Sequence, residues 1–349
     1  MSVMFRPPPF HADRPGLVAP VRLDPTGRQG PTRGQARGRR WRTASPGRFV
    51  PVDVPLTTGQ RIVEAASSLH DGAAVTGWAA LHWLGSPWFT GLAGDGATAL
   101  PVPVVTLRQL RPRPGILVSQ EFMAPWEVQL VDGVPVTRPA RSAGFEARRA
   151  STLVRAVTVL DMTAYSDLAD LSEIGSYAAQ LGPKTGIGQL RDALPLAEEN
   201  AWSPMEVEMR ELWRGTGRVR PLCNVPIFDL EGRHVATSDL LDVEAGVVGE
   251  YEGEVHLVGA RRAKDVAREG LLRRHGLEVV TMVAADRARP GDFFRRLDDA
   301  YRRAAHRRTD RRSWTTRQPN WWVPTETVAQ RRALSERQRA SLLRYRVAS

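Results

Sequence analysis

Residues 239–256 read Asp-Leu-Leu-Asp-Val-Glu-Ala-Gly-Val-Val-Gly-Glu-Tyr-Glu-Gly-Glu-Val-His, and the prediction of the fold starts from this stretch. The pattern predicts one strand from about His234 to Leu241 and another over Val247–Glu252. A turn at 242–246 separates them, because Asp and Gly favour turns. The short connection indicates an antiparallel hairpin.

Three carboxylates fall where this hairpin brings side chains together. Asp239 on the first strand is expected close to Glu250 on the second, and Glu252 shares a face with Glu250 because side chains alternate along a strand. Carboxylate oxygens suit Mg²⁺ (or Mn²⁺), which normally takes one or two protein carboxylates and keeps several waters. A phosphodiester bound there would meet a Lewis acid that lowers the pKa of a bound water. We therefore expect Asp239 and Glu250 to hold a divalent metal.

The residues after the hairpin extend this candidate site. His256 suits a general base or a contact to the leaving phosphate. A basic helix is expected from about Ala260 to His275, on which Asp265 and Arg268 fall at helical spacing. Asp265 would orient His256, and Arg268 would hold phosphate. The same two side chains also fit an exposed ion pair within the helix.

A helix start precedes the hairpin at Ser203-Pro204-Met205-Glu206. Ser203 is the expected N-cap, Pro204 suits the first helical position, and Glu206 completes a capping box. The elements expected from there on follow the order α-β-β-β-α-β, with the remaining strands near residues 225–230 and 277–282.

Together these residues resemble the PD-(D/E)XK nuclease superfamily, and within it the very-short-patch-repair-endonuclease-like domain of actinobacterial proteins. The resemblance implies a restriction-endonuclease-like α/β core with Asp239 and Glu250 as metal ligands. It places Glu252 at the third position of the motif and Glu206 as the acidic residue of the first helix. Two departures stand out: Glu252 replaces the Asp of the Glu-Tyr-Asp-Gly signature, and the hairpin carries no lysine.

A shorter segment upstream, residues 74–81, is similar to the N-terminal part of those proteins, which is AbiEi-type antitoxin-like. With two short helices expected in residues 57–85, it indicates a helical, winged-helix-like module. The expected fold class is α+β. The organisation is a disordered basic tail over 1–56, the helical module over 57–198, the nuclease-like domain over 199–302 and a mobile basic tail over 303–349.

Composition narrows the partners and the compartment. The chain has 349 residues and a formal net charge of +11, which favours polyanions such as DNA. Cys223 is the single cysteine, which excludes a disulfide framework and a cysteine-based zinc site. The sequence shows no P-loop or dinucleotide-binding glycine pattern. Without a signal-like N-terminus or a long apolar run, a soluble cytoplasmic protein with no membrane partner is expected.

Two functions of different classes fit these residues. One is a Mg²⁺-dependent DNA endonuclease, in which Glu252 or His256 helps to activate water. The other is a non-catalytic DNA-binding regulator or antitoxin-like protein with a degenerate nuclease fold and a possible toxin partner. The sequence leaves the choice between them, the recognised DNA and the oligomeric state open.

Overall fold

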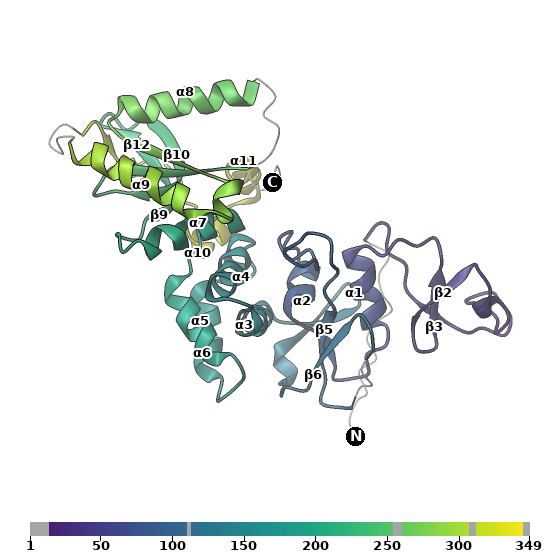
Figure 1. Ribbon diagram of the computed structural model, residues 1–349. Helices are drawn as coiled ribbons and strands as arrows, with labels where there is room; N and C mark the ends of the chain where they lie inside the picture. The colour runs from purple at the N-terminus through teal and green to yellow at the C-terminus, as the bar shows by residue number, and fades with distance from the viewer. Residues whose placement is uncertain (1–13, 110–112, 254–259, 307–311, 345–349) are drawn as a thin grey trace. The chain divides into compact units, whose positions relative to one another are not determined.

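The computed structural model describes residues 14–109, 113–253, 260–306 and 312–344 (Figure 1). The described part is a mixed α+β structure with three sheets, so the predicted α+β class is confirmed. The chain divides into two compact units. The first unit comprises residues 1–151 and 172–192, and the second comprises 152–171 and 193–349. The predicted boundary after residue 198 therefore lies slightly downstream of the observed one, and it misses the segment 152–171.

The second unit is built on a five-stranded sheet in the order β12-β11-β10-β9-β13. Strands β11 and β12 are parallel and the other neighbours are antiparallel. Its elements are α4 Leu153–Tyr165, α7 Pro204–Gly215, β9 Leu222–Asp229, β10 His234–Asp242, β11 Val247–Glu252, α8 Ala260–Arg274, β12 Glu278–Val283, α9 Pro290–Ala305, β13 Trp314–Thr315, α10 Val328–Arg332 and α11 Glu336–Leu342.

Helices cover both faces of this sheet (Figure 1). On one face, Met209 and Trp213 of α7 and Phe293 of α9 pack against the strands. On the other face, Leu272 of α8 joins a second apolar cluster with the strand residue Leu241. Because both faces are buried, neighbouring strand residues are held in fixed register.

The contact between α7 and β11 requires a glycine. A Cβ atom added at Gly249 would lie 2.8 Å from the side chain of Trp213, which is too close for a real contact. The helix begins at the predicted N-cap, because the Ser203 hydroxyl accepts a hydrogen bond from the Glu206 amide at 3.2 Å. The prediction of this helix start is confirmed.

The segment after residue 303 forms part of the second unit, so the prediction of a mobile tail is wrong for its described residues. Trp314 pairs with Asp229 at the edge of the sheet and is buried. Trp322 stacks on His234 with ring centroids 5.1 Å apart. These contacts join residues far apart in sequence, which local patterns do not show.

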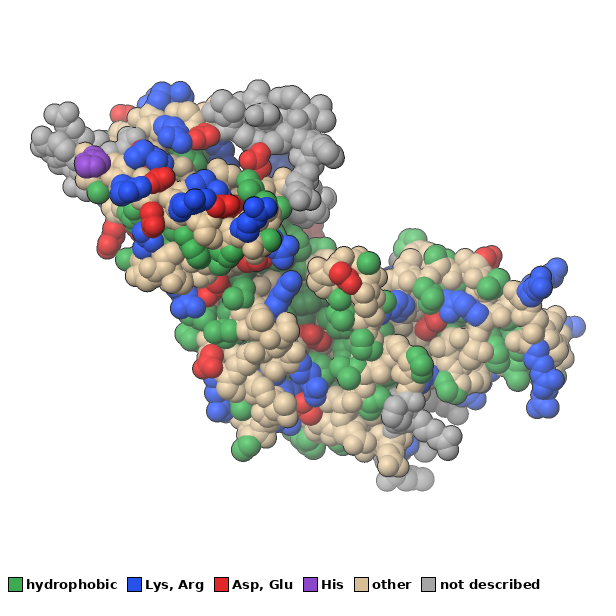
Figure 2. Space-filling model, in the orientation of Figure 1, with side chains coloured by type: hydrophobic (Ala, Val, Ile, Leu, Met, Phe, Trp, Pro, Cys, Tyr) green, Lys and Arg blue, Asp and Glu red, His purple; other side chains and the backbone are tan. Residues whose placement is uncertain are grey.

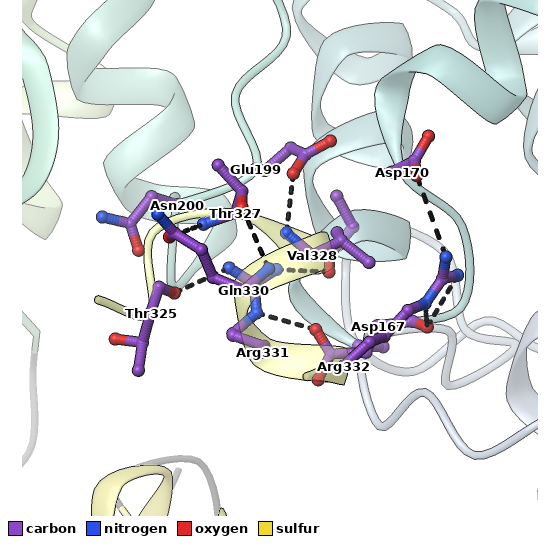
Figure 3. Close-up of polar contacts among 12 residues, drawn as sticks. Asp167, Asp170, Glu199, Asn200, Thr325, Thr327, Val328, Gln330, Arg331 and Arg332 are labelled. Carbon is purple, nitrogen blue, oxygen red and sulfur yellow. Dashed lines mark hydrogen bonds and ion pairs between the residues drawn. The ribbon is translucent and has the colours of Figure 1, made fainter. Parts of the chain in front are cut away.

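Arg331 on α10 anchors the same segment (Figure 3). Its side chain is fully buried, and its Nε donates to Asp167 Oδ1 at 2.7 Å. Its other nitrogens donate to the backbone carbonyls of Ala164, Thr325 and Glu326. Nearby, the amide of Val328 donates to Glu199 Oε2 at 2.7 Å. The buried charge is therefore paired and hydrogen-bonded, as stability requires.

The first unit contains the other two sheets. A three-stranded sheet has the order β1-β3-β2, and a five-stranded sheet has the order β6-β5-β4-β8-β7. The strands and helices are β1 Val21–Arg22, β2 Trp41–Ser45, β3 Arg48–Pro51, α1 Thr58–Ala66, β4 Ala74–Val75, α2 Gly77–Trp83, β5 Val102–Val105, β6 Ile116–Ser119, β7 Val128–Val131, β8 Val134–Thr137, α3 Pro139–Arg149, α5 Leu171–Gln180 and α6 Ile187–Ala193. Short 3₁₀ turns lie at Gln35–Arg37 and Pro125–Glu127 in this unit, and at Leu194–Leu196 and Ala284–Arg287 in the second unit.

Strands β1 to β3 correct the prediction that residues 1–56 are disordered. Arg42 on β2 makes two hydrogen bonds to the carboxylate of Glu64 on α1, at 2.8 and 2.6 Å. Gln60 bonds both the amide and the carbonyl of Val18. These two links from α1 hold a segment whose composition alone suggests disorder. Residues 1–13 lie outside the described part.

Helix α2 overlaps residues 74–81, a segment predicted to belong to a helical, winged-helix-like module, and it is buried. Six of its seven residues are buried, among them Trp78 and Trp83. A helix that is apolar all round sits in a core and presents no face to a DNA groove. No helix in the described residues has the length and apolar character needed to cross a membrane.

We expect Asp167→Asn to lower the free energy of unfolding by about 3 kcal/mol, because it leaves the buried guanidinium of Arg331 without its counter-charge. Asn also tolerates the positive φ of 56° at this position. Chemical denaturation of the full chain measures the change.

The matched control is Asp170→Asn in the same loop. Asp170 pairs with the partly exposed Arg332 at 3.8 Å, and such pairs contribute less than about 1 kcal/mol. Equal losses for the two variants would contradict the anchoring role of Arg331.

Candidate active site

The register of the β10–β11 hairpin places Asp239 opposite Glu250. Leu240 pairs with Gly249 and Leu241 with Val248, so the next step along both strands joins these two acids. The amide of Tyr251 donates to Asp239 Oδ2 at 2.7 Å and fixes that carboxylate across the hairpin. The predicted proximity of the two strand carboxylates is therefore present.

Glu206 brings a third carboxylate to the cluster from the first turn of α7. Its Oε2 accepts hydrogen bonds from the Trp202 amide at 2.8 Å and from Asn224 Nδ2 at 2.6 Å. The prediction that Glu206 completes a capping box is therefore only partly confirmed. The Glu206 side chain accepts a hydrogen bond from the amide of Trp202 instead of the amide of the N-cap Ser203. The same side chain stabilises the helix start and interacts electrostatically with Asp239.

Burial and mutual repulsion raise the pKa values of these acids. Burial raises the pKa of Glu206 to about 8, and the charge of Asp239 adds to the effect. Burial and then the charge of Asp239 raise the pKa of Glu250 to about 8 as well. Burial also raises the pKa of Asp239. Carboxylates that share one site in this way cannot all ionise without a counter-charge.

Arg268 on α8 supplies part of that counter-charge. Its Nη1 donates to Glu250 Oε2 at 2.7 Å, and its Nη2 donates to the carbonyl of Thr237. The guanidinium lowers the pKa of Glu250, but burial and Asp239 outweigh it. Arg268 was expected to hold phosphate; the structure shows it holding a carboxylate of the cluster.

Two oxygen atoms, one on Glu250 and one on the Asn224 that holds Glu206, are buried and have no hydrogen-bond partner among the described residues. They are Glu250 Oε1 and Asn224 Oδ1. Oxygen donors with surplus negative charge suit a hard divalent cation, so the residues fit Mg²⁺. In the described part of the chain, no three His, Cys, Asp or Glu side chains are grouped closely enough to hold a metal by themselves. The fit therefore rests on one or two carboxylates, as is usual for Mg²⁺.

Three further residues were predicted for this site: Glu252, His256 and Asp265. Glu252 is exposed at the end of β11, two residues beyond Glu250. His256 lies outside the described residues, and Asp265 lies on α8 where its side chain is not described. Their expected roles stay predictions.

Asn224 is a site residue that the sequence analysis missed. It lies within β9 at a φ of 46°, a left-handed conformation that Asn tolerates better than most residues. Its Nδ2 donates to both Glu206 Oε2 and the carbonyl of Asn200, while Asn200 Nδ2 donates to the carbonyls of Cys223 and Asn224. The available signal was an asparagine inside the otherwise apolar run 222–228.

The raised pKa values predict that the metal-free protein loses stability as pH rises. Between the ordinary glutamate pKa of 4.5 and about 8, Glu206 and Glu250 ionise in the unfolded chain but keep their protons in the folded one. The folded state then binds more protons, so the free energy of unfolding falls with pH across this window. Glu250→Gln should remove one such contribution, which changes the free energy of unfolding by at most about 1.4 kcal/mol per pH unit.

Urea unfolding in EDTA between pH 5 and 8 measures this dependence. The control is Glu244→Gln, which makes the same change at an exposed position in the turn of the same hairpin. Parallel profiles for wild type, Glu250→Gln and Glu244→Gln would contradict a charged cluster.

Comparison with known proteins gives relatives but no described activity. The chain matches no family profile and no solved structure. It is 31% identical over 191 residues to the uncharacterized protein Rv2248 of Mycobacterium tuberculosis strain H37Rv and to its counterpart MT2308 in strain CDC 1551. The match covers 54% of this chain and 69% of each mycobacterial protein. The chain belongs to the same family as these mycobacterial proteins.

Proposed function

We propose that the protein is a metal-dependent endonuclease that hydrolyses phosphodiester bonds in DNA. The observation that carries this proposal is that Asp239 and Glu250 lie opposite each other on β10 and β11, both half-buried, while the buried Glu206 of α7 interacts electrostatically with them. Strongly shifted carboxylates beside an arginine are typical of functional sites. Apolar side chains at these positions would stabilise the fold more than partly buried acids do. The presence of the acids is therefore better explained by a function than by stability.

The architecture of the second unit supports a restriction-endonuclease-like core. Helix α7, strands β9 to β11, helix α8 and strand β12 follow one another along the chain, and the parallel pair β11–β12 is bridged by α8. The resemblance to the PD-(D/E)XK superfamily covers this same segment. The acids occupy the positions that the resemblance assigns to the metal ligands and to the first helix.

In this proposal, Asp239 and Glu250 would hold Mg²⁺ (or Mn²⁺), which when bound would supply Lewis acidity and lower the pKa of a water. The chain's own groups prepare the site. The Tyr251 amide holds Asp239 in place, and Arg268 holds one oxygen of Glu250 while the other stays unpartnered among the described residues. With a pKa of about 8, Glu206 keeps a proton at neutral pH in the absence of metal.

A second candidate is a DNA-binding regulator whose nuclease fold is degenerate. It is favoured by the ion pair between Arg268 and Glu250, which neutralises a ligand that a metal would use. The hairpin also lacks the lysine common at the third position of the superfamily motif. This candidate requires DNA binding without cleavage, and it leaves room for a toxin partner.

Cleavage of DNA by the full chain tests the first candidate. Wild type should cut in Mg²⁺ or Mn²⁺ and not in EDTA, and Glu250→Gln should lower the rate by at least about 100-fold. That loss is the upper end seen for residues that merely orient metal ligands. The assay covers plasmid, linear, mismatched and single-stranded DNA.

Glu244→Gln is the matched control and should cut like wild type, since Glu244 is exposed in the hairpin turn. DNA binding measured on the same preparations separates the candidates. Salt-sensitive binding with no cleavage in any variant would favour the regulator and rule out the nuclease.

A further inference from the structure

A pocket in the first unit is lined by arginines from three separate segments. It has a volume of about 460 Å³, and its lining includes Arg22 on β1, Arg48 on β3 and Arg113 before β6, together with Ser67 and Ser68 after α1. Small-molecule sites are typically about 300–1,000 Å³, so the pocket has room for a small anion and part of its carrier. In Figure 2, Lys and Arg side chains project from the part of the molecule that carries β2 and β3.

Two like charges lie opposite each other at this pocket. Arg22 and Arg48 are direct cross-strand partners in the antiparallel pair β1–β3. Like charges at such positions destabilise a sheet. A sequence that kept this pair for stability alone would place an acid or a neutral residue at one of the two positions.

None of the three arginines has an acidic partner among the described residues. Arg42, on the neighbouring strand β2, shows the contrast because Glu64 holds it with two hydrogen bonds. Among the described residues, Arg113 donates to the hydroxyl of Ser68, which keeps the guanidinium at the pocket. Burial lowers the pKa values of Arg48 and Arg113, and the charge of Arg22 lowers that of Arg48 further. The pocket thus concentrates uncompensated positive charge.

We propose that Arg22, Arg48 and Arg113 form a binding site for a phosphate group. The planar guanidinium presents paired N–H donors that match phosphate oxygens, and three of them around one pocket suit a multiply charged oxyanion. The phosphate belongs either to a free phosphorylated small molecule or to the backbone of DNA. Both sources offer the same chemistry to the arginines.

Calorimetric titration of the full chain with inorganic phosphate tests this site, in EDTA and at ionic strength held constant with NaCl. Wild type should bind phosphate at one site, and Arg48→Gln should weaken binding at least tenfold. Arg22→Gln should do the same, and it makes the change at an exposed side chain where folding is not at risk. Arg28→Gln removes the same charge from an exposed position on the same segment and should leave the affinity unchanged.

Unfolding of the same variants separates ligand binding from a structural role. Relief of the like-charge pair should leave Arg48→Gln at least as stable as wild type without phosphate, while abolishing the rise in Tm that phosphate gives. No phosphate binding by wild type, or equal losses in Arg48→Gln and Arg28→Gln, would overturn the proposal.

Binding of duplex DNA by the same variants identifies the source of the phosphate. If Arg48→Gln weakens duplex binding at least tenfold while Arg28→Gln does not, the ligand is a backbone phosphate. If phosphate binding is lost but duplex binding is unchanged, the ligand is a free phosphorylated molecule. The phosphate site lies in the first unit and its binding is measured without metal, whereas cleavage depends on metal bound in the second unit. This proposal and the endonuclease proposal can therefore fail separately.

Discussion

The second unit depends on the burial of negative charge at one point of its sheet. Placing Asp239 opposite Glu250, with Glu206 beside them, costs free energy unless protons or a cation compensate it. Arg268 offsets only part of that cost, since the pKa of Glu250 stays raised despite the ion pair. The cluster is therefore a place where the fold gives up stability, and such places are most often functional.

The surrounding structure explains how the acids are held in place. Helix α7 packs directly on β11 because Gly249 has no side chain to collide with Trp213. This close packing fixes the position of Glu206, in the first turn of α7, relative to the strands. Asn224 then ties Glu206 to β9, and the Tyr251 amide ties Asp239 to β11. The C-terminal segment closes the far edge of the sheet, where Trp314 pairs with Asp229. These contacts from α7, β9 and β11 hold the carboxylates against their mutual repulsion.

Local patterns in the sequence predicted the elements of this unit well. The short apolar run after the turn at 242–246 and the Ser203-Pro204 helix start predict β11 and α7 at the observed positions, because each signal lies within a few consecutive residues. The hairpin connection was short enough to predict that Asp239 and Glu250 meet. Contacts between distant segments were not predictable. Two arginine-rich stretches, 1–56 and 303–349, were predicted to be tails, but ion pairs anchor their described parts. Arg42 pairs with Glu64 in the first, and Arg331 pairs with Asp167 in the second. Neither pairing leaves a trace in local composition. The asparagine inside the apolar run 222–228 marks position 224, but it does not identify Glu206 as the partner.

The most direct measurement of the central claim is the binding of Mn²⁺, followed by the loss of the free-ion electron paramagnetic resonance signal and by proton release at pH 7. Metal binding requires deprotonated ligands, so acids with raised pKa values must give up protons when the ion enters. We expect wild type to take up Mn²⁺ with release of protons, and Asp239→Asn to lose the uptake. A wild-type protein that leaves Mn²⁺ free in solution, or an Asp239→Asn protein that binds it equally well, would contradict the metal site.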